Sequence, residues 1–473
     1  MKEVKCEFEH SFENVSDVKN VLSNIGATMA VLKMLPKNAN DKNQVYIASD
    51  LNILHPTFAL TFQERGQSES ATKRQSDPKK MIPEAVFDSF HWLTNDYKQV
   101  QAKGVKAILY AQYPEARLSG FQTVENTMPR SMSIEYTKQA NAPKRLLVLA
   151  QLPGGAAVGM MVVAPSDSLI DEVNNLSSFN GSRICKKLII DQDGSTKLVK
   201  ILKGIVGKTF DGCRYDKHGN TIPFRGTQVC GYTLEHACAI IPNSDKNGDI
   251  FGIELKTHTQ KKVTLFTPEP DFGDYKNDYA SFMKTNGYQD TQGNWRLTGV
   301  HKANILSKKS GLTLKVRAKK YVKESKEWIE TDYDPEKCST AKMDYMDVVL
   351  VNSENHITAG WSYERLMNCW GVKHNEVVYI PASKQENSNE EKREKGYAFE
   401  VTFGEKIMWC KNTTADQLFK AIHEGTIFLD PAPKLHATDP SQNKRRSQWR
   451  VNDIAKAART LYEEVLFREL ATE

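Results

Sequence analysis

The chain has 473 residues, more than one hydrophobic core usually organises, so its length predicts two or three domains. Hydrophobic residues make up 40% and charged residues 26% of the chain, which excludes general disorder and is typical of a folded, soluble protein. The formal charge of +6 is compatible with a polyanionic partner but does not require one. The amino terminus lacks the apolar region of a signal peptide, and the longest apolar run, residues 154–164, is too short to span a membrane. We therefore expect a cytoplasmic protein with no membrane partner.

The first part of the chain has the pattern of an α+β module. Apolar runs at Met29–Leu35 and Gln44–Ala48, separated by polar turns, predict strands. Helical spacing predicts helices around Ile82–Thr94 and Asp96–Val105. Residues 66–80 contain almost no large apolar side chain, so we expect a mobile surface loop there.

A polar stretch at Pro165–Asn180 is the best candidate for a domain boundary. It divides the chain into an N-terminal domain, residues 1–175, and a second domain, residues 176–473. In the second domain, amphipathic patterns predict helices at Lys197–Ile205 and Tyr232–Ile241. Strands at Ile250–Lys256 and Lys262–Phe266 are expected to follow as a hairpin. A second polar insertion, residues 383–396, is expected to separate two later strands.

The residues with the clearest chemical pattern follow the second of these helices. Glu254 and Lys256 are two apart in a strand-like stretch, so their side chains project from one face, with Leu255 directed into the core. Asp249 precedes Glu254 by five residues, and a bent strand or a hairpin would bring both carboxylates to one cation. Glu235, on the helix, faces the same place if the helix packs on the strands, where it would support the site or hold a second ion.

Phosphodiester hydrolysis needs an activated water and compensation for the charge on the pentavalent phosphate. Mg²⁺ takes oxygen ligands, keeps several waters and needs only one or two carboxylates, which Asp249 and Glu254 can supply. Lys256 can orient the water and offset the phosphate charge. A D-x4-E-x-K string also arises by chance in a chain with 58 acidic and 64 basic residues, so the spacing alone does not decide the function.

The wider sequence around these residues resembles a known family. GYTLE, an acid, GIELKT and TLFTPEP, in this order within residues 231–270, are similar to the MvaI/BcnI family of restriction endonucleases and, more distantly, to the mismatch-repair nicking enzyme MutH. Later blocks at Trp361–Leu366, Val377–Ala382, Gly425–Asp430 and Ser441–Asn452 extend the resemblance over roughly residues 185 to 470. The first 175 residues are not matched, which implies an additional domain.

The resemblance implies an α/β second domain of the PD-(D/E)xK type, with a mixed sheet flanked by helices. It implies a metal-dependent DNA endonuclease in which Asp249 and Glu254 bind Mg²⁺, with Mn²⁺ able to substitute, Lys256 is the catalytic lysine and Glu235 is the helix glutamate. The implied function is that of a sequence-specific type II-like restriction enzyme acting on double-stranded DNA, as a monomer or a dimer. A cognate DNA methyltransferase or a phage-defence partner is compatible with this function.

Basic residues near the C-terminus suit contacts to DNA. Arginine reads phosphate and guanine in two-pronged geometry, and this segment crowds several cations around Trp449. The predicted DNA-binding residues are His436, Lys444, Arg445, Arg446 and Arg450. A solvated basic loop is the alternative.

The N-terminal domain shows only a faint resemblance to the B3-like effector domains of some restriction enzymes. It rests on residues 29–47, which place Lys33, Lys37 and Lys42 near the turns of a predicted β-barrel edge. We therefore expect an α+β domain that can include a β-barrel.

Two other functions remain open. The same centre would serve a MutH-like nicking enzyme or an anti-phage effector nuclease that a partner or a signal activates, and such a protein would cut plain plasmid poorly on its own. A DNA-binding protein with an inactive nuclease fold is the other alternative, and it would not cut at all.

Overall fold

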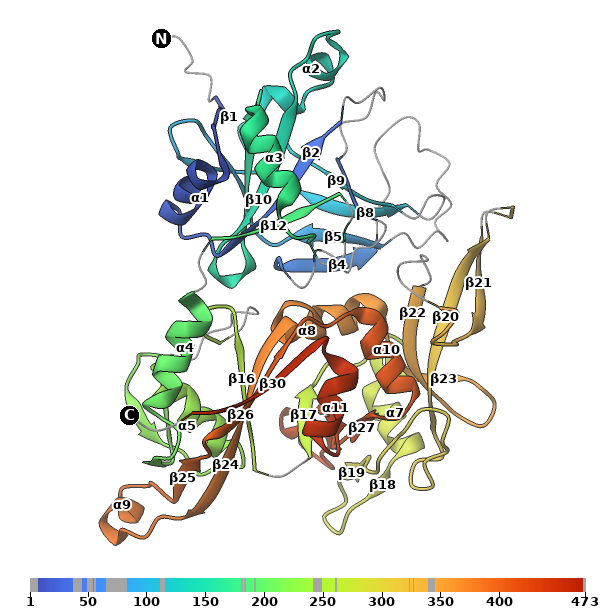
Figure 1. Ribbon diagram of the computed structural model, residues 1–473. Helices are drawn as coiled ribbons and strands as arrows, with labels where there is room; N and C mark the ends of the chain where they lie inside the picture. Colours follow the sequence, from blue (N-terminus) through green and yellow to red (C-terminus); the bar gives the residue numbers. More distant parts are fainter. Residues whose placement is uncertain are drawn as a thin grey trace. The chain divides into compact units, whose positions relative to one another are not determined.

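A computed structural model describes residues 7–36, 45–48, 54, 57–64, 83–110, 115–179, 182, 184–190, 193–240, 249–259, 262–322, 324–325, 327–338 and 345–470. The chain divides into two compact units (Figure 1). The first holds residues 1–197 with two short later pieces, 323–327 and 341–343, and the second holds the remainder. Within the described ranges, no helix has both the length and the apolar composition needed to cross a bilayer.

The first unit is built on two sheets. Its helices are α1 (Val15–Asn24), α2 (Ile134–Lys138) and α3 (Asp167–Asn175). Its strands are β1 (Glu9–His10), β2 (Met29–Leu35), β3 (Val45–Ala48), β4 (Leu60–Glu64), β5 (Pro83–Phe87), β6 (Phe90–Leu93), β7 (Gln99–Gln101), β8 (Lys106–Tyr110), β9 (Glu115–Ser119), β10 (Arg145–Gln151), β11 (Ala157–Val163) and β12 (Lys186–Ile189). One sheet has the order β12-β2-β10-β11-β6-β7 with β1 on β11, and the other has the order β3-β9-β8-β5-β4.

The core of the first unit lies between the larger sheet and two of the helices. Strands β10 and β11 pair antiparallel over their whole length, and alternate residues of both strands pack against the apolar faces of α1 and α3. Val18 and Leu22 of α1 and Leu169 and Val173 of α3 supply these faces. The predicted boundary after residue 175 falls at the end of α3, whereas β12 further along still pairs with β2. The division at residue 175 stays a prediction.

The first unit differs from the sequence expectations in its helices and at Lys33. The helices predicted at residues 82–94 and 96–105 are wrong, because these residues form β5, β6 and β7; the large rings of Phe90 and Trp92 pack over Gly159 of β11, and such aromatic runs favour strands. Lys33 is buried within β2, with its ammonium group over the Tyr46 ring at 5.1 Å, and not on a turn. Neither sheet closes into a barrel among the described strands. Lys37, Lys42 and the loop predicted at 66–80 lie outside the described residues.

The second unit contains the longer list of elements. Its helices are α4 (Asp193–Lys203), α5 (Val229–Ala237), α6 (Asp274–Asn277), α7 (Tyr279–Asn286), α8 (Tyr363–Asn375), α9 (Glu390–Glu394), α10 (Ala415–His423) and α11 (Ile454–Leu461). Its strands are β13 (Thr209–Asp211), β14 (Cys213–Tyr215), β15 (Thr221–Pro223), β16 (Glu254–His258), β17 (Val263–Phe266), β18 (Tyr288–Gln289), β19 (Trp295–Arg296), β20 (Thr313–Val322), β21 (Glu327–Asp332), β22 (Tyr345–Val351), β23 (Ile357–Trp361), β24 (Glu376–Glu386), β25 (Phe399–Phe403), β26 (Lys406–Lys411), β27 (Ile427–Leu429), β28 (Lys434–Leu435), β29 (Trp449–Val451) and β30 (Glu464–Glu469).

A mixed central sheet organises this unit. Its order is β13-β25-β24-β26-β30, and β16 adds to β24 as a parallel strand while the other pairs are antiparallel. Helices α4 and α5 pack on one face through Leu198, Leu202 and Leu234, and α8 and α11 lie on the other side of the sheet (Figure 1). The expected α/β architecture, a mixed sheet flanked by helices, is therefore confirmed.

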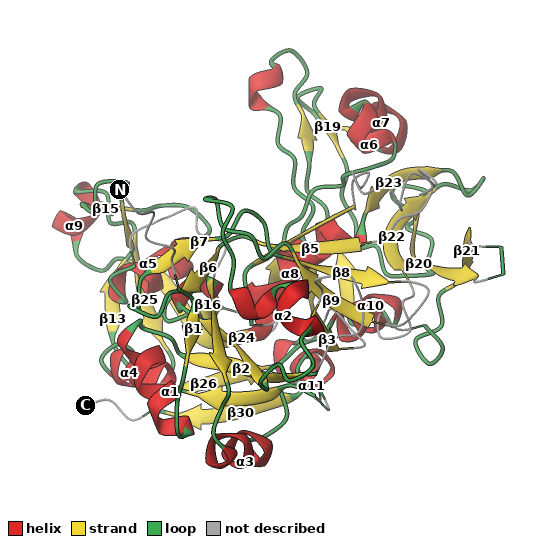
Figure 2. Cartoon of the chain, turned by 90° about the horizontal axis from the view of Figure 1, so that it is seen from above, coloured by secondary structure: helices red, strands yellow, loops and turns green. Residues whose placement is uncertain are grey.

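Smaller sheets extend the second unit. They have the orders β17-β29-β27, β18-β19-β28 and β21-β20-β22-β23, and β19 lies beside α7 (Figure 2). The predicted hairpin of β16 and β17 is wrong, because β16 pairs with β24 and β17 pairs with β29. The polar insertion expected at residues 383–396 is ordered in part: β24 continues to Glu386 and α9 follows.

Candidate active site

Strand β16 places Glu254 and Lys256 side by side. Leu255 between them is buried in the core against α5, so strand alternation turns its two neighbours to the opposite face. Lys256 Nζ lies 3.0 Å from Glu254 Oε1. Glu254 is buried, at 7% exposure, whereas the Lys256 side chain is 18% exposed. Solvent therefore reaches the ion pair from the side of Lys256.

A tight turn brings Asp249 back onto the same strand. Ile250 and Ile253 exchange both backbone hydrogen bonds, with N···O distances of 3.2 and 2.9 Å. The two residues between them, Phe251 and Gly252, have φ values of +54° and +77°, the signature of a type I′ turn.

The turn fixes the first acid relative to the E-x-K strand. Asp249 Oδ2 accepts a 2.8 Å hydrogen bond from the backbone N–H of Leu255, the residue between Glu254 and Lys256. Asp249 is therefore held at the strand segment that carries Glu254 and Lys256, and the roles of the three residues stay predictions. The Phe251-Gly252 turn itself was missed, although a glycine at this position is the usual signal for it; the Asn247-Gly248 signal lies outside the described residues.

Glu235 lies on α5, near the residue that precedes the turn. This helix packs on β16, and Cys238 at its C-terminal end is buried in the interface. Burial first, and then the charges of Asp249 and Glu235, raise the pKa of the Cys238 thiol to about 12. Both carboxylates therefore lie near the same thiol, which stays protonated at neutral pH and is no candidate metal ligand.

The donor set suits a hard cation. Asp249 and Glu254 supply carboxylate oxygens, and a magnesium ion needs only one or two of these because waters complete its shell. Within the described part of the chain, no group of three or more His, Cys, Asp and Glu side chains is gathered as a metal site. The two carboxylates, with waters to complete the shell, fit Mg²⁺.

A row of buried polar side chains lies near Glu254, and no sequence pattern indicated it. Tyr379 lies opposite Lys256 in the register of β24, and its hydroxyl is 3.0 Å from that of Tyr462, which is 3.3 Å from His374 Nδ1. Burial raises the pKa of both tyrosines, and the charge of Glu254 adds to the shift. The two hydroxyls therefore stay neutral, and they form a buried polar pair near Glu254.

The predicted DNA-binding residues separate into two kinds. Lys444, Arg445 and Arg446 are exposed, and the Arg445 guanidinium lies over the Tyr279 ring at 4.6 Å and the Tyr275 ring at 5.5 Å. Tyr279 also donates a 3.0 Å hydrogen bond to the Lys444 carbonyl, which holds this segment against α7. These cations are available to a polyanion, and one of them is held in place by aromatic faces.

Arg450 and His436 have partners within the protein. Arg450 donates to Thr264 and to Asp430, each at 2.9 Å, and is half-buried in β29. His436 Nδ1 accepts from the backbone N–H groups of Thr438 and Asp439, so the ring closes a local turn. Their contact with DNA stays a prediction, and the structure gives each of them a role in the fold.

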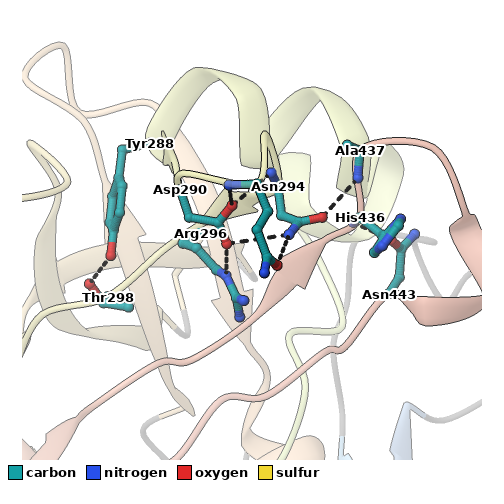
Figure 3. A network of polar contacts seen from close by, with 9 residues as sticks. Tyr288, Asp290, Asn294, Arg296, Thr298, His436, Ala437 and Asn443 are labelled. Carbon is teal, nitrogen blue, oxygen red and sulfur yellow. Dashed lines mark hydrogen bonds and ion pairs between the residues drawn. The ribbon is translucent and has the colours of Figure 1, made fainter.

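The loop after β28 is fastened to the β18–β19 hairpin. Asn294 Oδ1 accepts a 3.1 Å hydrogen bond from the Ala437 N–H, and Asn294 itself is held by Asp290 (Figure 3). Asp290 also accepts from Arg296 Nε at 2.8 Å, and this hydrogen bond is the main reason why the pKa of Asp290 falls to about 2. The segment 436–450 is therefore anchored at Ala437 by this network and at Lys444 by α7.

The family model of the MvaI/BcnI restriction endonuclease family matches residues 200–462, more than half of the chain. The chain belongs to the MvaI/BcnI family. The match includes all the predicted site residues, and the first 199 residues lie outside it, in agreement with the expected resemblance.

Two solved structures are similar to the chain. The complex of restriction endonuclease MvaI with cognate DNA has a TM-score of 0.42 and 16% identity, covering 59% of this chain and 98% of MvaI. MvaI without DNA has a TM-score of 0.31 and 15% identity, with the same coverage. Among the curated proteins, none matches the chain. The MvaI/BcnI family is one of restriction endonucleases, so DNA cleavage is the activity that membership indicates.

Proposed function

We propose that the chain is a sequence-specific, type II-like restriction endonuclease that hydrolyses DNA phosphodiesters with Mg²⁺. The observation that carries the proposal is the Phe251-Gly252 turn, which fixes Asp249 on the backbone of Leu255 between the ion-paired Glu254 and Lys256. This arrangement gives a hard cation two oxygen ligands beside an ammonium group. Family membership supports DNA as the substrate.

In the proposed mechanism, Asp249 and Glu254 hold the divalent ion, for which Mn²⁺ can substitute. When bound, the ion supplies an activated water and neutralises charge on the phosphate. Lys256, held by Glu254, orients that water and offsets the negative charge that develops on the phosphate oxygens. Glu235 is proposed to support the ion-binding acids from α5. Each chain holds one such centre, so cutting both strands takes two successive nicks or two molecules.

The exposed cations of the basic segment are proposed to hold the duplex. Lys444, Arg445 and Arg446 face solvent, and Arg445 is kept over two tyrosine rings, which reduces the entropy lost when it binds. Phosphate contacts of this kind fix the position of the duplex, and an arginine can also read guanine. Arg450 and His436 are kept as weaker candidates because both serve the fold.

The first unit is proposed to bind DNA or to regulate the nuclease. The family match does not include it, and its smaller sheet is an open antiparallel arrangement, which leaves the predicted barrel as a proposal. If this unit gates the active site, the chain is instead a MutH-like nicking enzyme or a phage-defence effector that a partner or a signal activates.

The direct test is plasmid cleavage by the purified full chain. With Mg²⁺, the restriction enzyme is expected to give linear products whose sequenced ends share one short motif and carry 5′-phosphates; with a chelator it is expected to give none. Nicked circles alone, or cutting that requires an added partner, would favour the gated nuclease. Cutting at random sequence in Mg²⁺ would contradict sequence specificity, and intact plasmid under every condition would contradict the nuclease assignment.

A further inference from the structure

A second feature of the active-site face is a cavity of about 560 Å³ at the start of α11. His258 at the end of β16, Lys456 and Arg459 of α11, and Phe467 of β30 are among the residues that line it. It belongs entirely to the second unit. No role in the proposed catalytic centre accounts for it.

The sheet register places the cavity on the catalytic face. Lys256 pairs with Tyr379, Tyr379 with Met408 and Met408 with Phe467, so these side chains project from one face of the sheet. His258 follows Lys256 by two residues and also belongs to this face. The strand rises about 3.3 Å per residue, so His258 lies about 7 Å along the strand from Lys256. The cavity is therefore next to the place where the scissile phosphate must sit.

The charges around the cavity suit an anion. Lys456 and Arg459 are three residues apart on one face of α11, both are exposed, and neither forms an ion pair with any residue that the structure describes. Asp453, the acid at the rim, caps the helix: its Oδ1 accepts from the backbone N–H groups of Ala455 and Lys456, at 3.1 and 3.3 Å. The cavity is thus lined by two cations and by one carboxylate, and that carboxylate caps the helix.

The cavity also offers apolar contact beside the cations. Ile454 is buried, and Phe467, which is 59% exposed, is among the lining residues. Exposed lysine and arginine side chains without an internal partner also lose no existing ion pair when they bind a phosphate.

We propose that this cavity holds the backbone phosphate next to the scissile phosphate on the cleaved strand, with Lys456 and Arg459 as its cationic partners and His258 at its inner edge. The proposal rests on the proposed nuclease function for its placement. It adds a positioning site: a neighbouring phosphate fixed here sets the strand in line with Asp249, Glu254 and Lys256. The exposed cations at residues 444–446 would contact the duplex elsewhere.

The first experiment measures how salt affects the binding of a mixed-sequence DNA duplex to the full chain without Mg²⁺. For Lys456→Ala with Arg459→Ala, we expect about tenfold weaker binding and a salt slope shallower by about 0.9, the value for one phosphate contact. The matched control is Lys200→Ala with Lys203→Ala, two cations with the same spacing on α4, which covers the other face of the sheet. This control should bind like the wild type. An unchanged slope in the first variant would overturn the proposal.

The second experiment locates the phosphate. Single phosphates around a mapped cleavage point are replaced by uncharged methylphosphonates, and the affinity of each duplex is measured. The wild type should lose about tenfold at one phosphate adjacent to the cut, and the Lys456→Ala/Arg459→Ala variant should lose nothing further there. Equal losses in both proteins, or a loss only at a distant phosphate, would overturn the placement. If the wild type cuts nowhere, the nuclease assignment fails, while the salt slope still decides whether the cavity binds DNA.

Discussion

Two regions of the second unit, the Asp249–Lys256 turn and strand and the basic segment at 436–450, are organised in different ways. In the first, the Leu255–Asp249 hydrogen bond, the Glu254–Lys256 ion pair and the Ile250–Ile253 turn all lie within eight residues of chain. In the second, Arg450 depends on Thr264, 186 positions away, and Arg445 lies over rings of α6 and α7. The contacts of the first region are thus local in sequence, whereas the role of each arginine depends on partners that only the fold brings to it.

The largest expected effect comes from removing the charge of Asp249 while its hydrogen bond to the backbone is kept. Asp249→Asn keeps an oxygen that can accept from the Leu255 N–H but removes the negative charge. We expect cleavage to fall by about a thousandfold or more, because the metal loses a carboxylate, while folding and DNA binding remain. Plasmid cleavage rates and a thermal melt check both parts. Near wild-type cutting would show that Asp249 is not a metal ligand.

We expect the exposed arginines of the basic segment to act on DNA binding and the internally bonded Arg450 to act on stability. For Arg445→Ala with Arg446→Ala, we expect roughly ten- to a hundredfold weaker DNA binding and a salt slope shallower by up to about 1.8, as for two lost phosphate contacts. Arg450→Ala should leave the slope unchanged and lower the free energy of unfolding by about 1–3 kcal/mol, because the hydrogen bonds to Thr264 and Asp430 are lost, while Lys262 still pairs with Asp430. Binding titrations at several salt concentrations, with urea melts, make the comparison. A shallower salt slope in Arg450→Ala, with an unchanged slope in Arg445→Ala/Arg446→Ala, would show that Arg450 contacts the phosphates and that Arg445 and Arg446 do not.

Glu235→Gln tests whether α5 contributes to the metal site. The carboxylate lies near the same thiol as Asp249. We expect about a tenfold loss of cleavage that higher Mg²⁺ concentration partly restores, as for a group that supports metal ligands from behind. Cleavage rates across a range of Mg²⁺ concentrations measure it. A loss as large as that of Asp249→Asn would make Glu235 a ligand in its own right.

The smallest effect concerns the turn itself. Gly252 has φ of +77° and open space where a Cβ would project, so Gly252→Ala meets backbone strain and no clash. We expect a stability loss of about 1 kcal/mol and a modest decrease in cleavage. Phe251→Asn, at φ of +54°, should leave stability unchanged or raise it slightly, since asparagine tolerates this conformation. Urea melts of both variants check it; a destabilised Phe251→Asn would mean that the exposed ring matters more than the backbone.

The sequence predicted part of this structure, and each error has a physical reason. Alternation along β16 was correct because burial of Leu255 against α5 fixes the register. The pairing of β16 was wrong because its partner, β24, begins 118 residues after β16 ends, and a parallel neighbour leaves no local signal. The strands at residues 83–101 were taken for helices because short apolar runs fit both periods. Tyr379, Tyr462 and the cavity beside His258 have no sequence pattern at all, since distant elements assemble them.

Metal binding tests the central claim most directly. Mn²⁺ binding to the full chain, with a DNA duplex present, can be followed by electron paramagnetic resonance for the wild type and for Asp249→Asn, Glu254→Gln and Lys200→Ala. The account predicts at least one tightly bound ion in the wild type and in Lys200→Ala, and that this ion is lost or strongly weakened in each acid variant. Equal Mn²⁺ binding in all four proteins would contradict it.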